Sequence, residues 1–114
     1  MFLGGREDQQ RASALTEAWP GPVVDLCGRL SPRESAAALS RAALFIGHES
    51  GVLHLADAVG TPAVGLFGDY NKPKMWHPRG PHTRVIHRLP GIKEISPTEV
   101  LAEVVELVAV EPRA

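Results

Sequence analysis

The sequence predicts an α/β domain built on an open, doubly wound parallel sheet. Apolar runs alternate with stretches of helical periodicity, and Gly and Pro separate them. The run at 42–47 is almost continuously apolar, which is typical of a strand covered on both faces and therefore of a parallel sheet. The alternation gives about five strands and four helices, and ligands of such sheets bind beyond the carboxyl ends of the strands.

The bulk composition predicts a single domain over residues 1–114. The formal net charge is -1 and 44% of the residues are hydrophobic, so neither a nucleic-acid partner nor a disordered chain is indicated. The single cysteine, Cys27, cannot form an internal disulfide. Because we find no signal peptide and no run long enough to span a bilayer, we expect a cytoplasmic protein with at most peripheral membrane contact.

The N-terminal half is predicted to alternate between strand and helix. A strand end at 1–5 leads into a helix over 7–19, which Pro20 ends, and a short strand follows at 23–27. The apolar positions of that first helix are Ala12, Leu15, Ala18 and Trp19. The next helix, over 31–41, begins with a Ser N-cap, a Pro at the first position and a Glu at the third.

The second half repeats the alternation around a central helix that starts at Ser50. Strands are predicted at 42–47, 63–68 and 83–87, and a loop of about a dozen residues lies at 69–82. The stripe of the central helix that packs on the sheet is Val52, Leu55, Ala56 and Val59. A closing helix follows a second Ser-Pro-x-Glu start, with the apolar residues Val100, Leu101, Val104, Val105, Leu107 and Val108.

The start of the central helix is the candidate phosphate site. The first backbone N–H groups of a helix have no internal partner and carry partial positive charge, so Ser50, Gly51 and Val52 are suited to a phosphate or diphosphate. The structural alternative is a Ser N-cap followed by Gly with no ligand.

Two neighbouring side chains, Glu49 and His54, could join this site. Glu49 could accept hydrogen bonds from sugar hydroxyls, or merely favour the helix start by its charge. His54, one turn on, could donate to a phosphate or a hydroxyl, or bond Ser50 or Asp57 within the helix.

In the long loop, Lys74 could neutralise a diphosphate, as could Lys72 and Arg79, although solvated loop charges are the alternative. Tyr70 and Trp76 in the same loop could stack on a base. The five histidines lack compact ligand spacing, so no metal site and no metal cofactor are expected.

Four stretches together resemble the C-terminal half of glycosyltransferase family 9, the heptosyltransferases of lipopolysaccharide core assembly. They are Leu26 to Glu34, Ala43 to Ala56, Gly60 to Gly68, and Trp76 to Gly80. The centre of the pattern is acidic-Ser-Gly-x-x-His-x-Ala, followed by Gly-Thr-Pro and Phe-Gly.

This resemblance implies a Rossmann-like domain of a GT-B glycosyltransferase that binds a nucleotide-activated sugar, typically ADP-heptose. The family's donor contacts carry onto Glu49, Ser50, Gly51 and Val52, and its motif histidine onto His54. Position 49 is Glu where the family more often has Asp. The N-terminal acceptor domain and the general base expected on it are not part of these 114 residues, so this chain alone is not expected to complete a transfer.

Two classes of function follow. The first is a donor-binding glycosyltransferase domain that works with a separately encoded acceptor domain or comes from a longer enzyme, with no cofactor other than the donor substrate. The second is a non-catalytic nucleotide- or phosphate-binding module, or a degenerate relic of such an enzyme. A third hypothesis pairs Glu49 with Asp57, eight residues on, as in GT-B enzymes that use UDP- or GDP-sugars. An unpaired strand edge near 1–5 predicts a surface for homo-oligomer formation.

Overall fold

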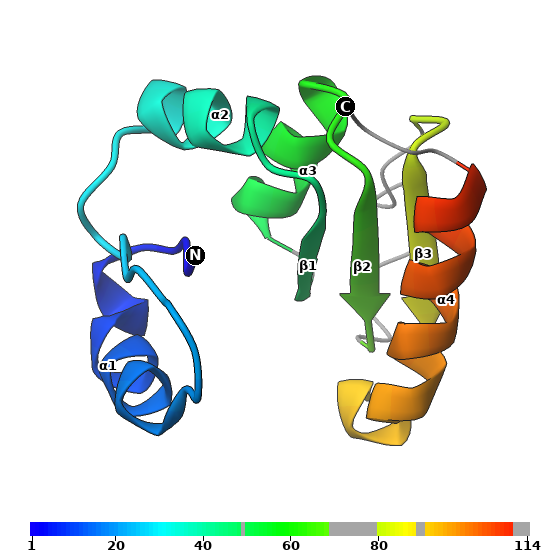
Figure 1. Ribbon diagram of the computed structural model, residues 1–114, viewed down its shortest axis with the longest axis horizontal. Coiled ribbons are helices and arrows are strands. Elements are labelled where there is room, and N and C mark those ends of the chain that lie inside the picture. The colour runs from blue at the N-terminus through cyan, green and yellow to red at the C-terminus, as the bar shows by residue number, and fades with distance from the viewer. Residues whose placement is uncertain (49, 69–79, 89–90, 111–114) are drawn as a thin grey trace.

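The three C-terminal strands form one parallel sheet, as the sequence predicts. The computed structural model describes residues 1–48, 50–68, 80–88 and 91–110. Strands β1 (Phe45–His48), β2 (Ala63–Phe67) and β3 (Thr83–His87) lie in the order β1-β2-β3 (Figure 1). All pairs are parallel, with Phe45 opposite Ala63 and Ala63 opposite Thr83. The carboxyl ends of the strands therefore share one edge of the sheet.

Helices cover both faces of this sheet. On one face, α2 (Pro32–Ser40) and α3 (Gly51–Ala58) enclose a core whose buried residues are Leu39, Leu53, Ala56, Ala63 and Phe67. On the other face, α4 (Pro97–Val110) buries Leu107 against Val64 and Ile86. Alternate residues of a strand point to opposite faces, so Ala63 and Phe67 of β2 face α3 whereas Val64 faces α4.

Local sequence features fix the ends of the two central helices. The Ser31 hydroxyl accepts from Glu34 N–H at 3.2 Å and the Glu34 carboxylate accepts from Ser31 N–H at 2.8 Å, which is the capping box that the sequence predicts before α2. Gly60 ends α3 in the left-handed region, with φ 78°. The buried Thr61 hydroxyl donates to Leu39 O at 2.6 Å and so ties the start of β2 to α2.

The N-terminal part contains less strand than we predicted. The segments at 1–5 and 23–27 meet in a single parallel bridge between Phe2 and Asp25, and the described residues form no longer strand there. A 3-10 turn, η1 (Arg6–Asp8), and α1 (Gln9–Ala18) connect them. A second 3-10 turn, η3 (Ile92–Glu94), precedes α4. Among the described residues the Phe2 segment has a strand neighbour on one side only, and a lone pair of segments is marginal without further strands.

Some apolar side chains lie where the helical pattern did not place them. Leu15 and Trp19, two of the apolar positions at helical spacing in the first predicted helix, are each about half exposed, and Trp19 meets Phe2 edge to face at 5.7 Å. Leu53 was not in our predicted stripe, yet it is fully buried, because α3 lies between α2 and the sheet and so buries a wider arc. Three apolar residues of α4, namely Leu101, Val105 and Val108, are exposed.

Candidate functional site

Ser50 caps the helix that starts at the carboxyl end of β1. Its backbone is extended, with φ -169° and ψ 167°, and its hydroxyl accepts from Leu53 N–H at 3.3 Å. Because the hydroxyl takes up the N–H of the third helical residue, the N–H groups of Gly51 and Val52 remain at the open end of α3. The macrodipole adds partial positive charge at the same place, so the geometry is that of an anion site.

The surroundings of these two amides leave room for a ligand. Gly51 is exposed, and a Cβ built on it would meet no atom within 4 Å among those the structure describes. Ser50 and Val52 line one end of a cavity of about 710 Å³ that runs along β1 towards the N-terminal segment. A diphosphate could therefore reach the amide groups without displacing any residue that the structure describes.

His54 lies one turn further along α3 and is exposed. Its backbone N–H donates to Ser50 O at 3.4 Å, while its imidazole makes no hydrogen bond to any residue that the structure describes. The internal bonds to Ser50 or Asp57, which were the structural alternative, are thus not formed. The ring remains available beside the helix start.

Asp57, on the next turn, has a role that the sequence did not indicate. Its carboxylate accepts from Gly80 N–H at 3.1 and 3.3 Å and from the Thr83 hydroxyl at 2.6 Å. A Cβ on Gly80 would collide with Asp57 Oδ1, so a side chain there would have to displace the Asp57 carboxylate. Asp57 therefore fastens the start of β3 to α3, and these bonds engage the carboxylate that the third hypothesis paired with Glu49. The sequence gives no sign of this role, because Asp57 and Gly80 lie 23 residues apart.

Several predicted site residues lie outside the described part of the chain. They are Glu49, Tyr70, Lys72, Lys74, Trp76 and Arg79. Their roles remain predictions. Of the predicted site, the structure brings together Ser50, Gly51, Val52 and His54 on the first two turns of α3.

Neither a metal centre nor a membrane-spanning helix is found among the residues that the structure describes. No group of three or more His, Cys, Asp and Glu side chains in this part of the chain is placed to hold a metal ion. None of its helices is both long and apolar enough to cross a membrane.

The Cys27 thiol is buried beside Asp25. Burial raises the pKa of this thiol to about 11, and the Asp25 carboxylate adds to the effect. A thiol that stays protonated at neutral pH is a poor nucleophile, so Cys27 is a structural residue rather than a reactive one.

Known proteins match both the sequence and the fold. The chain is 45% identical over 47 residues to lipopolysaccharide heptosyltransferase 3 of Escherichia coli, a match that covers 41% of this chain and 14% of that protein. A family 9 glycosyltransferase from Veillonella parvula superposes with a TM-score of 0.86 at 23% identity, over 96% of this chain and 36% of that one. The structure described as ADP-heptose lps heptosyltransferase II of E. coli gives 0.86 at 22% identity, over 97% and 36%.

These matches confirm the predicted α/β fold with a parallel sheet, of the GT-B type. The chain spans about a third of the length of the two solved structures and about a seventh of the curated relative. The model of the family described as glycosyltransferase family 9 (heptosyltransferase) matches residues 1–102. The chain therefore belongs to glycosyltransferase family 9, the heptosyltransferase family.

Proposed function

We propose that this chain binds the donor of a glycosyl transfer, a nucleotide-activated sugar of the ADP-heptose kind. The observation that carries the proposal is the start of α3, where the Ser50 hydroxyl accepts from Leu53 N–H, Gly51 is exposed, and the N–H groups of Gly51 and Val52 stand in the first turn of the helix. Family membership supports a sugar donor, and one solved relative is described as an ADP-heptose enzyme. The acceptor that fits the family is a lipopolysaccharide core.

In the proposed reaction the acceptor hydroxyl attacks the anomeric carbon of the donor, and the bond from that carbon to the diphosphate breaks. The amide groups of Gly51 and Val52 would stabilise the negative charge that grows on the departing diphosphate. Glu49 is proposed to contact the sugar, and Lys74 to neutralise part of the diphosphate charge. His54 would donate to a phosphate oxygen or a hydroxyl. The general base is proposed to come from an acceptor domain, and the protein is proposed to act in the cytoplasm.

A calorimetric titration of the full chain with ADP, UDP and GDP tests the donor site. Ser50→Asp is the informative variant, because Asp also caps helices well but adds a negative charge next to the bound diphosphate. We expect ADP to bind in preference to UDP and GDP, and the variant to bind at least about tenfold more weakly, since a close charge of the same sign costs about 1.4 kcal/mol or more.

The matched control is Ser31→Asp. Ser31 is the N-cap of α2, so this substitution makes the same chemical change at a helix start outside the proposed site. It should leave the affinity unchanged. Equal affinity of Ser50→Asp and the unmodified chain for ADP would refute the assigned site.

The second candidate is a binding module without transfer activity, which would use the same helix start for a nucleotide or phosphate. Binding and transfer can be separated. A donor-binding domain should bind the nucleotide, release no ADP from ADP-heptose with acceptor alone, and release ADP once an acceptor domain is added. A module without transfer activity should bind the nucleotide and release no ADP in either case.

A further inference from the structure

Helix α4 carries an exposed apolar face on the side of the molecule away from α2 and α3 (Figure 1). Leu101 is 61% exposed, Val105 is 60% exposed and Val108 is 48% exposed. Because an α-helix turns by about 100° per residue, these three side chains fall within about 60° of one another around α4. Ala102 and Ala109 are also exposed and continue the same face. We call these five residues the outer face of α4.

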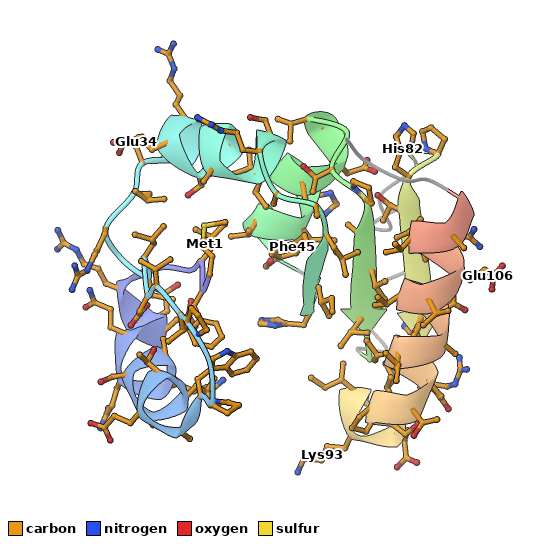
Figure 2. All side chains as sticks on the ribbon, viewed as in Figure 1. Met1, Glu34, Phe45, His82, Lys93 and Glu106 are labelled. Atoms are coloured by element: carbon orange, nitrogen blue, oxygen red, sulfur yellow. The ribbon has the colours of Figure 1, made fainter. Side chains whose placement is uncertain are left out.

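The charged residues of α4 lie away from the outer face. They are three glutamates, each at least about 100° around the helix from Val105, namely Glu99, Glu103 and Glu106. The Glu106 carboxylate meets Arg84 of β3 at 3.4 Å, and the Glu99 carboxylate meets Arg88 at 3.6 Å. Figure 2 shows the Glu106 side chain projecting from α4 away from β1 and β2. The outer face itself therefore carries no charge.

The outer face reads the same in both directions along the helix. Leu101 and Ala109 lie four residues on either side of Val105, and Ala102 and Val108 lie three residues on either side. If two α4 helices pack antiparallel about a two-fold axis at Val105, Leu101 of one copy is level with Ala109 of the other, and Val108 is level with Ala102. Each of these contacts pairs a larger side chain with an alanine, which lets the helix axes approach to about 8 to 10 Å.

The glutamates favour the antiparallel arrangement over a parallel one. About the axis at Val105, Glu103 is level with Leu107 of the second copy and Glu106 is level with Val104, so no two glutamates of the two α4 helices are level. A parallel pair would place each glutamate level with its own copy. Like charges brought together across an interface cost free energy, so the charges select the antiparallel pair.

We propose that the outer face of α4 is a self-association surface, on which a second copy of this chain packs its own α4 antiparallel about a two-fold axis at Val105. An interface between identical patches must be complementary to itself, and the outer face meets this condition. A partner of another sequence would not require the face to read the same in both directions. Since the contact is one helix pair, about 21 Å long, it is smaller than a standard interface of about 1,600 Å², and the dimer is weak and reversible.

Disulfide cross-linking of the full chain tests the position of the axis. In Val105→Cys the two new thiols meet at the axis, whereas in Thr98→Cys they lie about 21 Å apart along the helices, far beyond the Cα separation of about 7 Å that a disulfide tolerates. Thr98 is exposed and lies within about 20° of Val105 around α4, so it is a matched control. We expect the linked dimer to form at least tenfold faster in Val105→Cys. Peptide mapping separates this link from any that involves the buried Cys27.

Sedimentation equilibrium tests the surface without a cross-link. The unmodified chain should associate to a dimer as its concentration rises, and Val105→Lys should raise the dissociation constant at least tenfold, because two positive charges then meet at the axis. Leu15→Lys is the matched control, since Leu15 is an apolar side chain of α1 that is 49% exposed. This variant should dimerise like the unmodified chain.

A chain that stays monomeric at every concentration would overturn the proposal. Equal rates of cross-linking in Val105→Cys and Thr98→Cys would overturn it as well, because a parallel pair places both residues level with their own copies. A third contrary result is a Val105→Lys variant that dimerises as tightly as Leu15→Lys. These measurements contain no nucleotide, so their outcome is independent of the proposed donor site.

Discussion

At the scale of single residues, Asp57 joins two parts of the chain that the sequence separates. It accepts from Gly80 N–H and from the Thr83 hydroxyl, the latter at 2.6 Å, so α3 holds the start of β3 in place. The same helix carries the proposed donor site at its other end. The position of the site and the position of β3 are therefore coupled through eight residues of helix.

Replacing Asp57 with Ala should lower the free energy of unfolding by about 1 to 3 kcal/mol, because the part-buried Gly80 N–H and Thr83 hydroxyl both lose their acceptor. Thr83→Val, which removes one of these bonds and keeps the shape, should cost less, about 1 kcal/mol. Urea denaturation of the three proteins measures both values. A variant Asp57→Ala as stable as the unmodified chain would show that these bonds contribute nothing.

Cys27 gives a prediction of pH dependence. Its pKa in the folded chain is raised from 9.0 to about 11, first by burial and then by Asp25. As the pH rises, the unfolded chain loses the Cys27 thiol proton before the folded chain does. The contribution of the buried, protonated thiol to the free energy of unfolding is therefore complete below pH 9 and declines as the pH rises to about 11.

Alkylation with iodoacetamide measures this directly. We expect labelling of the native chain to remain slow at pH 8 and to rise only as the pH approaches 11, whereas the chain in urea should label readily near pH 9. Similar rates for the native and unfolded chains at pH 8 would contradict the burial of this thiol.

At the scale of elements, the end of β2 is packed closely against the segment that precedes α4. A Cβ on Gly68 would collide with Ile92 N, and it would lie 2.5 Å from Gly91 C. Both obstacles are backbone atoms, so they cannot move aside as a side chain can. Glycine at 68 thus allows η3 and α4 to close over the far face of the sheet.

Gly68→Ala should therefore destabilise the fold by about 1 to 3 kcal/mol, the range for forcing an extra methyl into a filled space. Gly21→Ala is the control, because a Cβ there meets nothing within 4 Å of the described structure. Thermal unfolding compares the two. If both variants unfold at the same temperature as the unmodified chain, the close approach of β2 to 91–92 is not a constraint.

At the scale of the whole molecule, local patterns predicted the helices and the three strands of the sheet, but they overpredicted strand in the N-terminal part and did not show how far each side chain is buried. The capping box at Ser31 and Glu34 and the glycine end of α3 at Gly60 depend on neighbours a few residues away, so the sequence shows them directly. The parallel sheet followed from the same kind of pattern, because strands covered on both faces are nearly all apolar.

The features that we missed depend on contacts between distant segments. Leu53 is buried because α2 packs against α3, and Trp19 is half exposed although its ring meets Phe2. The anchor from Asp57 to Gly80 spans 23 residues. In the candidate site, the helix start was predictable from its Ser-Gly turn, whereas the cavity beside it is lined by segments far apart in the sequence.

The most direct test of the donor site is an NMR titration of the full chain with ADP-heptose, followed at the backbone amides. The proposal predicts that the largest shifts fall on Gly51 and Val52, whose N–H groups would bind the diphosphate, and that Ser50→Asp suppresses them. Shifts that leave these two amides unmoved while others respond would contradict the assignment of the donor site to the start of α3.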